Sequence, residues 1–178
     1  MVLAAMFSAL IAVGAFIQIP IPFLSFSLQT LFLALAVVLL KPRWAVASVV
    51  IYIAIGLVGF PIFSRGGGIG YIVQPSFGFL IGFVLWAWVS STMISKMKHR
   101  TIWRVFGAEV VGVVLMYAVA LPYYDLIMRF YEASPMTASM LFTYCFATTF
   151  PGDVLKSLLA AWMGLRIQRQ LGESRAAR

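Results

Sequence analysis

The chain has 178 residues, of which 63% are apolar and only 10% are charged, and its formal net charge is +8. A mean hydropathy of +1.02 excludes an ordinary soluble domain, because so few polar residues cannot cover the outside of a globule of this size. The excess positive charge lies at the ends of apolar segments, with no basic face or aromatic stacking platform, so nucleic acid is excluded as a partner.

Four long runs of the sequence contain no Asp, Glu, Lys or Arg: residues 1–40, 44–64, 66–95 and 133–152. An α-helix needs about 20 apolar residues to cross the hydrocarbon core of a bilayer. The sequence therefore predicts an all-α integral membrane protein with a single domain over residues 1–178. The amino-terminal run lacks a basic n-region and a small-residue cleavage site, so we expect a retained helix and not a signal peptide.

Six transmembrane helices are predicted in chain order, over residues 2–17, 26–40, 44–58, 75–95, 103–121 and 151–167. The fourth and the sixth begin near a proline, which suits a first helical turn because its missing N–H is no loss there. Residues 122–150 contain Pro135 and several serines and threonines. They are polar enough that we expect an external loop in place of a seventh crossing.

The distribution of basic residues predicts the orientation of this bundle. With six helices and cytoplasmic amino and carboxyl termini, the internal segments carry ten Lys or Arg residues, and the external loops carry only Arg65 and Arg129. This matches the positive-inside rule. A seventh helix would place the basic carboxyl-terminal tail outside. We therefore predict a compact bundle of six transmembrane helices with both termini in the cytoplasm.

Asp153 and Lys156 are the strongest candidates for a binding site, because both are charged and both lie in the last apolar segment. An ionisable side chain deep in a membrane costs roughly 2.5–3.5 kcal/mol on insertion scales. Their spacing places them on one helical face. A bound polar ligand would complete their bonding, with Lys156 as donor and Asp153 as acceptor. The alternative is an ion pair without a ligand.

Further polar and flexible positions lie near the predicted outer ends of the helices. Gly67 and Gly68 belong to a glycine-rich stretch that fits neither a Walker loop nor a dinucleotide fingerprint, so a loop folding over a pocket, or a plain flexible loop, is expected. Tyr71 and Gln74 can hydrogen-bond a ligand at a helix mouth. The remaining candidates are the mid-helix Tyr117, whose hydroxyl needs a partner, and the helix-end Gln29.

Small residues repeat along two of the predicted helices. Gly78 and Gly82 are four residues apart, a spacing that lets two helices approach closely, and internal packing is the simplest interpretation. The first helix has a stripe of small side chains that suits either internal packing or docking to another membrane protein. Its members are Ala5 and Ala9 on one face, with Ala4, Ser8 and Ala12 beside them.

Cys145 is the single cysteine and His99 the single histidine in the sequence. One cysteine excludes an internal disulfide and a cysteine-based metal cluster. Together the two residues cannot supply a metal site of normal ligand count, so no metal is predicted.

Several segments, taken in order, resemble the BioY family, the biotin-specific S components of energy-coupling factor (ECF) transporters. They are AFIQIPIP (15–22), FSLQTL (26–31), GLVGFPIF (56–63), the glycines of 66–68, PSFGFLIGF (75–83) and FPGDVLK (150–156). Each motif alone is weak, but their order and spacing together cover nearly the whole chain. The family usually has Gly-Tyr where this chain has Gly78 and Phe79, so a hydroxyl is missing there.

The resemblance implies a non-enzymatic, multi-pass subunit of the bacterial cell (inner) membrane that binds biotin as substrate, without a cofactor. It implies partnership with a transmembrane T component and paired cytoplasmic ATPases, and the chain itself has no ATP-binding motif. Asp153 and Lys156 match the family's polar biotin contacts, and Phe77, Tyr71 and Tyr117 are expected as aromatic walls. Ala5 and Ala9 match the surface that meets the T component.

Two alternative functions stay open on sequence alone. The first is an S component for another small vitamin. The second is an intramembrane enzyme that uses Asp153 as a general acid or base, which would need a second reactive group within hydrogen-bond reach. No Ser/His or paired-carboxylate arrangement is visible in the sequence, so the enzyme is the weaker alternative.

Overall fold

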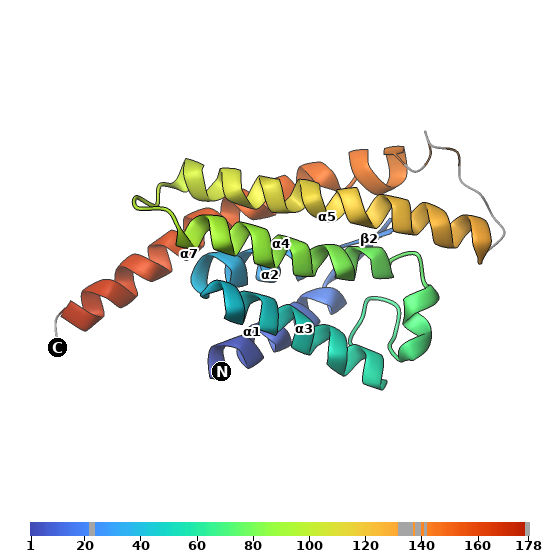
Figure 1. The fold of residues 1–178 in the computed structure, drawn as a ribbon, viewed down its shortest axis with the longest axis horizontal. Helices are drawn as coiled ribbons and strands as arrows, with labels where there is room; N and C mark the ends of the chain where they lie inside the picture. Colours follow the sequence, from blue (N-terminus) through green and yellow to red (C-terminus); the bar gives the residue numbers. More distant parts are fainter. Residues whose placement is uncertain (22–23, 132–136, 138–139, 141, 177–178) are drawn as a thin grey trace.

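The computed structural model describes residues 1–21, 24–131, 137, 140 and 142–176, without the side chains of 19–26, 142, 144 and 171–176. Within these residues, six α-helices form an elongated bundle (Figure 1). They are α1 (Val2–Phe16), α2 (Gln29–Leu39), α3 (Pro42–Val58), α4 (Phe77–Ser95), α5 (Ile102–Phe130) and α7 (Phe150–Ala176). The helical bundle predicted from the sequence is confirmed.

The helices pack through a few pairings that are visible in the ribbon. Helices α4 and α5 lie side by side, α7 packs against α2 and α5, and α1 packs against α2 and α3 (Figure 1). Glycines make the α4–α5 approach possible, since a Cβ built on Gly82 would lie 2.8 Å from Met116 and one built on Gly78 would lie 2.7 Å from Tyr123. The packing role predicted for these two glycines is confirmed.

Helix length and hydropathy agree with a membrane protein. The helices α4 and α5 have 19 and 29 residues, with apolar windows of mean hydropathy 1.8 and 2.0 that are long enough to cross a membrane. Three other apolar helices are shorter, because α1, α2 and α3 have 15, 11 and 17 residues. The predicted orientation of the termini stays a prediction.

A short hairpin replaces the predicted start of the second helix. Strand β1 (Gln18–Ile21) pairs antiparallel with β2 (Leu24–Ser27), with Gln18 opposite Ser27. The backbone N–H of Leu28 donates to the Ile17 carbonyl at 3.0 Å and closes the base of the hairpin. The prediction of a helix from residue 26 is therefore wrong by three residues. Strand pairing in β2 uses backbone groups of residues 26–27 that the predicted helix would have used.

Helix α5 is longer than predicted, and part of the expected external loop is helical. It continues through Pro122 to Phe130, whereas the sequence predicted an end at residue 121. A proline removes one intrahelical hydrogen bond and does not always end a helix. Beyond it, Arg129 donates to Asp125 across one helical turn at 2.8 Å, which supports the extension.

The carboxyl-terminal helix also exceeds its predicted bounds of 151–167. A π-helix, Phe142–Ala147, lies within the segment predicted as a loop, and α7 then runs from Phe150 to Ala176. The predicted loop residues 132–136, 138–139 and 141 lie outside the described residues.

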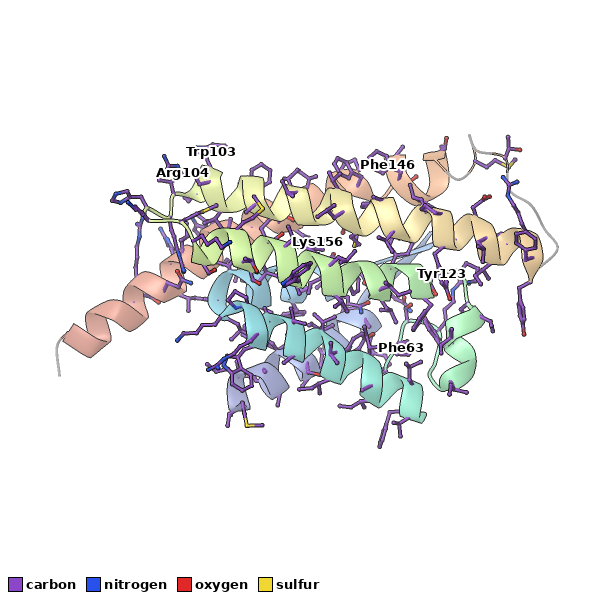
Figure 2. The ribbon with its side chains drawn as sticks, viewed as in Figure 1. Phe63, Trp103, Arg104, Tyr123, Phe146 and Lys156 are labelled. Atoms are coloured by element: carbon purple, nitrogen blue, oxygen red, sulfur yellow. The ribbon has the colours of Figure 1, made fainter. Side chains whose placement is uncertain are left out.

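The two ends of the bundle carry different segments of the chain. Trp103 and Arg104 lie at the end where α4 connects to α5, while Phe63 and Tyr123 lie toward the other end (Figure 2). The 3₁₀-helix η1 (Ile69–Val73) belongs to this second end, and the Tyr123 hydroxyl donates to the Ile72 carbonyl within it. Lys156 lies between the two ends.

Candidate functional site

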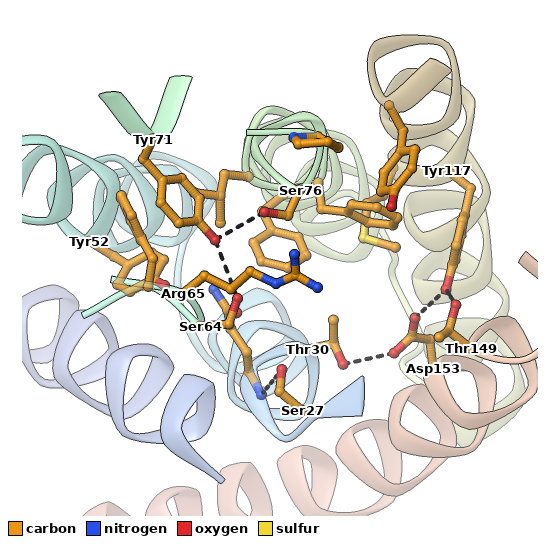
Figure 3. Close-up of a pocket in the computed structure, with 18 of the residues that line it drawn as sticks. Ser27, Thr30, Tyr52, Ser64, Arg65, Tyr71, Ser76, Tyr117, Thr149 and Asp153 are labelled. Carbon is orange, nitrogen blue, oxygen red and sulfur yellow. Dashed lines mark hydrogen bonds between the residues drawn. The ribbon is translucent and has the colours of Figure 1, made fainter. Parts of the chain in front are cut away.

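A cavity opens among the hairpin, η1 and the helices α2, α4, α5 and α7 (Figure 3). Its empty volume is about 780 Å³, a value that includes space open to solvent. The lining side chains are charged, hydroxyl-bearing or amide, and aromatic or aliphatic. They are Asp153, Lys156 and Arg65; Ser27, Thr30, Ser64, Ser76, Thr149 and Gln29; and Tyr52, Phe63, Tyr71, Phe79, Phe83, Tyr117, Tyr124, Pro75, Leu80 and Met116.

An ion pair lies in the wall of this cavity on α7. The Lys156 Nζ is 2.7 Å from the Asp153 Oδ1, and both residues are buried, at 7% and 5% exposure. Lys156 also donates to the Ser27 carbonyl at 2.8 Å. The hairpin therefore has a direct role, because the last residue of β2 presents its carbonyl to the lysine. The pair faces the cavity and the protein interior, not lipid.

Hydroxyl groups from two other helices complete the surroundings of Asp153. Thr30 at the start of α2 donates to Oδ1 at 2.8 Å, and Tyr117 on α5 donates to Oδ2 at 2.7 Å. The Tyr117 hydroxyl also lies 2.6 Å from Thr149 Oγ1. A carboxylate offers about four acceptor positions. Lys156, Thr30 and Tyr117 occupy three of them, so the carboxylate can accept about one further hydrogen bond.

The start of α7 explains why these groups meet. Thr149, Asp153 and Lys156 follow at intervals of four and three residues, which places them on one helical face. The Asp153 N–H donates to the Thr149 carbonyl at 3.1 Å, and Thr149 Oγ1 donates to the Cys145 carbonyl at 2.7 Å in the preceding π-helix. Short π-helical segments are frequent at functional sites.

A second polar cluster lies on the η1 side of the cavity. Ser76 Oγ donates to the Tyr71 hydroxyl at 3.1 Å, and Ser64 Oγ lies 3.3 Å from the same hydroxyl. Arg65 is exposed, and its side chain reaches between this cluster and Thr30 (Figure 3). The two lining cations therefore belong to different polar clusters, with Lys156 beside Asp153 and Arg65 beside Ser64.

The loop that carries Arg65 is anchored on the last turn of α3. Gly68, with a φ of 96°, donates its N–H to the Gly56 carbonyl at 2.7 Å. The Phe63 ring packs against Gly56 so closely that a Cβ on this glycine would overlap it. Phe63 also contacts the Tyr71 ring, with centroids 4.5 Å apart. These contacts hold one wall of the cavity in place.

Five of the predicted ligand-binding residues line the cavity: Asp153, Lys156, Tyr71, Tyr117 and Gln29. Their binding of a ligand stays a prediction. Phe79 also lines the cavity, with its ring edge-to-face on Tyr117 at 5.7 Å. A phenylalanine can still supply an apolar wall.

Four predicted residues do not line the cavity: Gln74, Phe77, Gly67 and Gly68. Phe77 lies behind the wall between the rings of Tyr71 and Tyr123, at 6.5 and 6.1 Å. A Cβ on Gly67 would overlap the Phe60 carbonyl, so this glycine serves close backbone packing. A ligand contact of these four stays a prediction, and in this structure they lie outside the cavity lining.

Of the hydroxyl groups around the ion pair, the sequence predicted that of Tyr117 but not those of Thr30 and Thr149. Thr149 lies one turn before Asp153, so helical spacing could have indicated it. Thr30 directly follows the predicted Gln29, so its position next to a candidate could have indicated it. Ser27 acts through its backbone carbonyl, for which side-chain chemistry gives no signal. Arg65 was assigned only to an external loop.

The predicted partner stripe on α1 divides into exposed and buried positions. Ala5 and Ala9 are exposed, Ala12 is half-buried, and Ala4 and Ser8 are buried at 2% and 4% exposure. Ala4 and Ser8 thus serve internal packing, and the surface left for a partner is that of Ala5 and Ala9.

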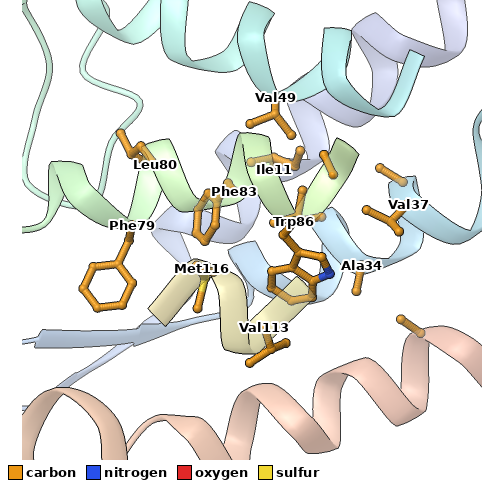
Figure 4. Close-up of a cluster of buried hydrophobic side chains, with 14 of the residues drawn as sticks. Ile11, Ala34, Val37, Val49, Phe79, Leu80, Phe83, Trp86, Val113 and Met116 are labelled. Carbon is orange, nitrogen blue, oxygen red and sulfur yellow. The ribbon is translucent and has the colours of Figure 1, made fainter. Parts of the chain in front are cut away.

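A second buried carboxylate lies between α4 and α5, outside the cavity lining. Glu109 is fully buried, and its Oε2 accepts a hydrogen bond from Trp86 Nε1 at 2.6 Å. Its Oε1 has no partner among the described residues. Trp86 itself packs beside Phe83, Val113 and Met116 (Figure 4). This site is filled by side chains.

Fold and cavity together define a helical membrane protein with a polar cavity among its helices. The chain matches the BioY family over residues 1–173. It therefore belongs to the BioY family.

Named relatives and a solved structure agree with this membership. A protein of Lysinibacillus sphaericus, "Probable biotin transporter BioY", is 39% identical over 99% of this chain and 90% of its own length. "Biotin transporter BioY" of Thermotoga maritima is 30% identical over 93% of this chain and 94% of its own length. The crystal structure of the S-component for biotin from an ECF-type ABC transporter has the same fold, with a TM-score of 0.82 at 23% identity, over 94% of this chain and 89% of that one.

Proposed function

We propose that this protein is the biotin-binding S component of an ECF-type vitamin transporter and that it captures biotin from the outer side of the membrane. The buried Asp153–Lys156 pair in the wall of a cavity of about 780 Å³ carries this proposal. Such a pair is costly to embed in a membrane protein. A polar ligand that hydrogen-bonds to it explains why it faces a cavity.

Biotin has a distribution of polar groups that fits the two clusters. Its ureido ring carries two N–H donors and a carbonyl, and its carboxylate lies at the end of an aliphatic chain. The ureido ring fits beside Asp153 and Lys156, with one N–H on the remaining acceptor position of the carboxylate. The biotin carboxylate then points to Arg65, and a guanidinium is well suited to a carboxylate. Phe79 and Tyr117 form the apolar wall for the sulfur-containing ring.

The first experiment is mass spectrometry of small molecules that co-purify with the detergent-solubilised protein, where biotin is expected. Titration with biotin and biotin methyl ester then tests the orientation. Arg65→Gln should weaken biotin binding about tenfold or more and leave the ester unchanged, because only biotin presents a charge. Arg129→Gln, a cation outside the cavity lining, is the matched control. Wild-type biotin affinity in both Asp153→Asn and Lys156→Ala contradicts the proposed site.

The proposed partners are a transmembrane T component and paired cytoplasmic ATPases. The exposed Ala5 and Ala9 on α1 support this, since small side chains allow close helix approach. Replacing both with leucine should spare biotin binding and block co-purification with a T component. The opposite result, lost binding with intact assembly, assigns the stripe to internal packing.

The proposed location is the bacterial inner membrane, with several crossings and both termini in the cytoplasm. Exposed cations of the loops and helix ends support this, namely Lys41, Arg43, Lys96, Lys98, Arg100, Arg104, Arg166 and Arg169. In intact cells, a cysteine at Lys98 should be protected from a membrane-impermeant maleimide, and one at the exposed Ile69 should be labelled. The reverse labelling pattern contradicts the orientation.

A further inference from the structure

One face of α7 points away from the bundle and carries an ordered series of side chains, here called the α7 stripe. Leu155, Leu159 and Trp162 on this face are 67%, 42% and 43% exposed, and Arg166 and Arg169 are exposed as well. The spacing of four and three residues keeps all five on one face. The opposite face holds the buried Asp153, Lys156 and Ala160, so the stripe is not part of the cavity.

The order of the α7 stripe follows the levels of a lipid leaflet. With a rise of 1.5 Å per residue, Leu155 and Trp162 are about 10 Å apart along the axis, and Arg166 and Arg169 lie about 6 and 10 Å beyond the tryptophan. Aliphatic side chains suit acyl chains, tryptophan is enriched at the membrane–water interface, and arginine suits the phosphate level. The guanidinium of Arg166 lies over the Trp162 ring at 4.7 Å, which joins the two adjoining levels.

Among the residues whose side chains the structure describes, no acidic residue pairs with this surface. The acidic residues with described side chains are Glu109, Asp125 and Asp153. Asp125 pairs with Arg129, Asp153 pairs with Lys156, and Glu109 is buried against Trp86. No described ion pair therefore involves Arg166 or Arg169. A partner with net negative charge complements the two arginines.

We propose that the α7 stripe binds an anionic phospholipid, with an acyl chain along Leu155 and Leu159 and the headgroup phosphate at Arg166 and Arg169. A zwitterionic lipid has the same phosphate but brings a cation beside it, so the stripe prefers a lipid with net negative charge. The inference does not depend on which small molecule occupies the cavity.

The test is native mass spectrometry of the full chain in detergent, titrated with phosphatidylglycerol and, separately, with phosphatidylcholine of the same acyl chains. Arg166→Gln/Arg169→Gln should lower the affinity for phosphatidylglycerol by about tenfold or more, since each surface cation contributes to the attraction of anionic lipid. Lys96→Gln/Lys98→Gln removes the same charge from the α4–α5 connection. This control should change the affinity less than about threefold.

A second measurement does not rely on the arginine variants. A photo-crosslinking benzoylphenylalanine at Leu159, activated in membranes, should yield an adduct with the mass of a phospholipid. The proposal is overturned by an adduct with a polypeptide, which would make the α7 stripe a protein interface. It is also overturned by equal loss of phosphatidylglycerol affinity in the arginine and lysine variants, which indicates diffuse charge attraction.

Discussion

Asp153 and Glu109 are both buried carboxylates in the same helical bundle, and they have opposite surroundings. Asp153 has a lysine at 2.7 Å and hydroxyl donors from α2 and α5, and it faces a cavity. Glu109 has one indole donor, and its second oxygen has no partner among the described residues. Of the two, only Asp153 has both a cation and hydroxyl donors that stabilise its charge and a cavity beside it that could hold a ligand.

The difference shows that burial of a polar residue in a membrane protein does not by itself identify a binding site. An unpaired buried charge is very costly, while a paired and hydrogen-bonded one is tolerated. Asp153 meets that condition and has an acceptor position left for a ligand. Glu109 is enclosed between α4 and α5, where its hydrogen bond to Trp86 joins two helices. The proposed function assigns ligand binding to the first, and the second joins α4 to α5.

The largest expected effect separates the two carboxylates by ligand affinity. Asp153→Asn should weaken biotin binding at least about 30-fold, because truncating one partner of a buried charge pair costs about 2–5 kcal/mol. Glu109→Gln, the same change of acid to amide, should alter affinity less than about threefold. Isothermal titration calorimetry on both purified variants measures this. Equal losses of biotin affinity in the two variants would contradict this distinction. Gel filtration checks that both variants are folded.

Removal of a hydroxyl donor to Asp153 should have an intermediate effect on biotin affinity. Tyr117→Phe removes a hydrogen bond to Asp153 and should lower biotin affinity about 10-fold or more, because a hydrogen bond to a charged group contributes about 1.5–3 kcal/mol. Tyr123→Phe is the control on the same helix, since its hydroxyl bonds to Ile72 and does not face Asp153. An unchanged affinity in Tyr117→Phe shows that the network is not used by the ligand.

Loss of the hydrogen bond between Trp86 and Glu109 should lower the stability of the protein and not its biotin affinity. Trp86→Phe leaves the buried carboxyl without its donor, which costs about 1–3 kcal/mol. At about 2–4 °C per kcal/mol for a chain of this size, we expect Tm to fall by several degrees while biotin affinity stays within about threefold. Thermal unfolding in detergent, with the exposed Trp88→Phe as control, checks this. If Trp86→Phe lowers biotin affinity and leaves Tm unchanged, Glu109 belongs to the binding site.

The smallest effect concerns Ser157, next to Lys156. Its Oγ is buried without a hydrogen-bond partner among the described residues, so Ser157→Ala should change the stability by less than about 0.5 kcal/mol. Ser90→Ala is the contrast, because the Ser90 Oγ donates to the Ala108 carbonyl at 2.7 Å and its loss should cost about 1 kcal/mol. A clear destabilisation by Ser157→Ala indicates a water molecule or ligand bound to this hydroxyl.

The sequence was sufficient to predict the helical membrane fold and the central ion pair. Charge-free runs give the crossings because hydrocarbon excludes charge, and the same rule makes Asp153 and Lys156 conspicuous. Helix ends were less predictable. The hairpin takes residues 26–27 from the expected second helix, and Pro122 lies within α5 without ending it.

The rest of the site depends on pairings between distant segments. Thr30 and Asp153 are 123 positions apart, and Lys156 reaches a backbone carbonyl 129 positions away. Threonine and serine are common at helix ends, so residue type alone does not separate Thr30 from a simple cap. Only the packing of α7 against α2 shows that the hydroxyl serves the carboxylate.

The 29 residues of α5 give a helix about 43 Å long, while the hydrocarbon core of a bilayer is about 30 Å thick. A thicker membrane would therefore cover more of its carboxyl-terminal turns, which lie beside η1, the element whose Tyr71 lines the cavity. The acyl-chain length of the lipids would then affect how readily a solute enters the cavity from water. Uptake should therefore depend on bilayer thickness even where affinity in detergent does not.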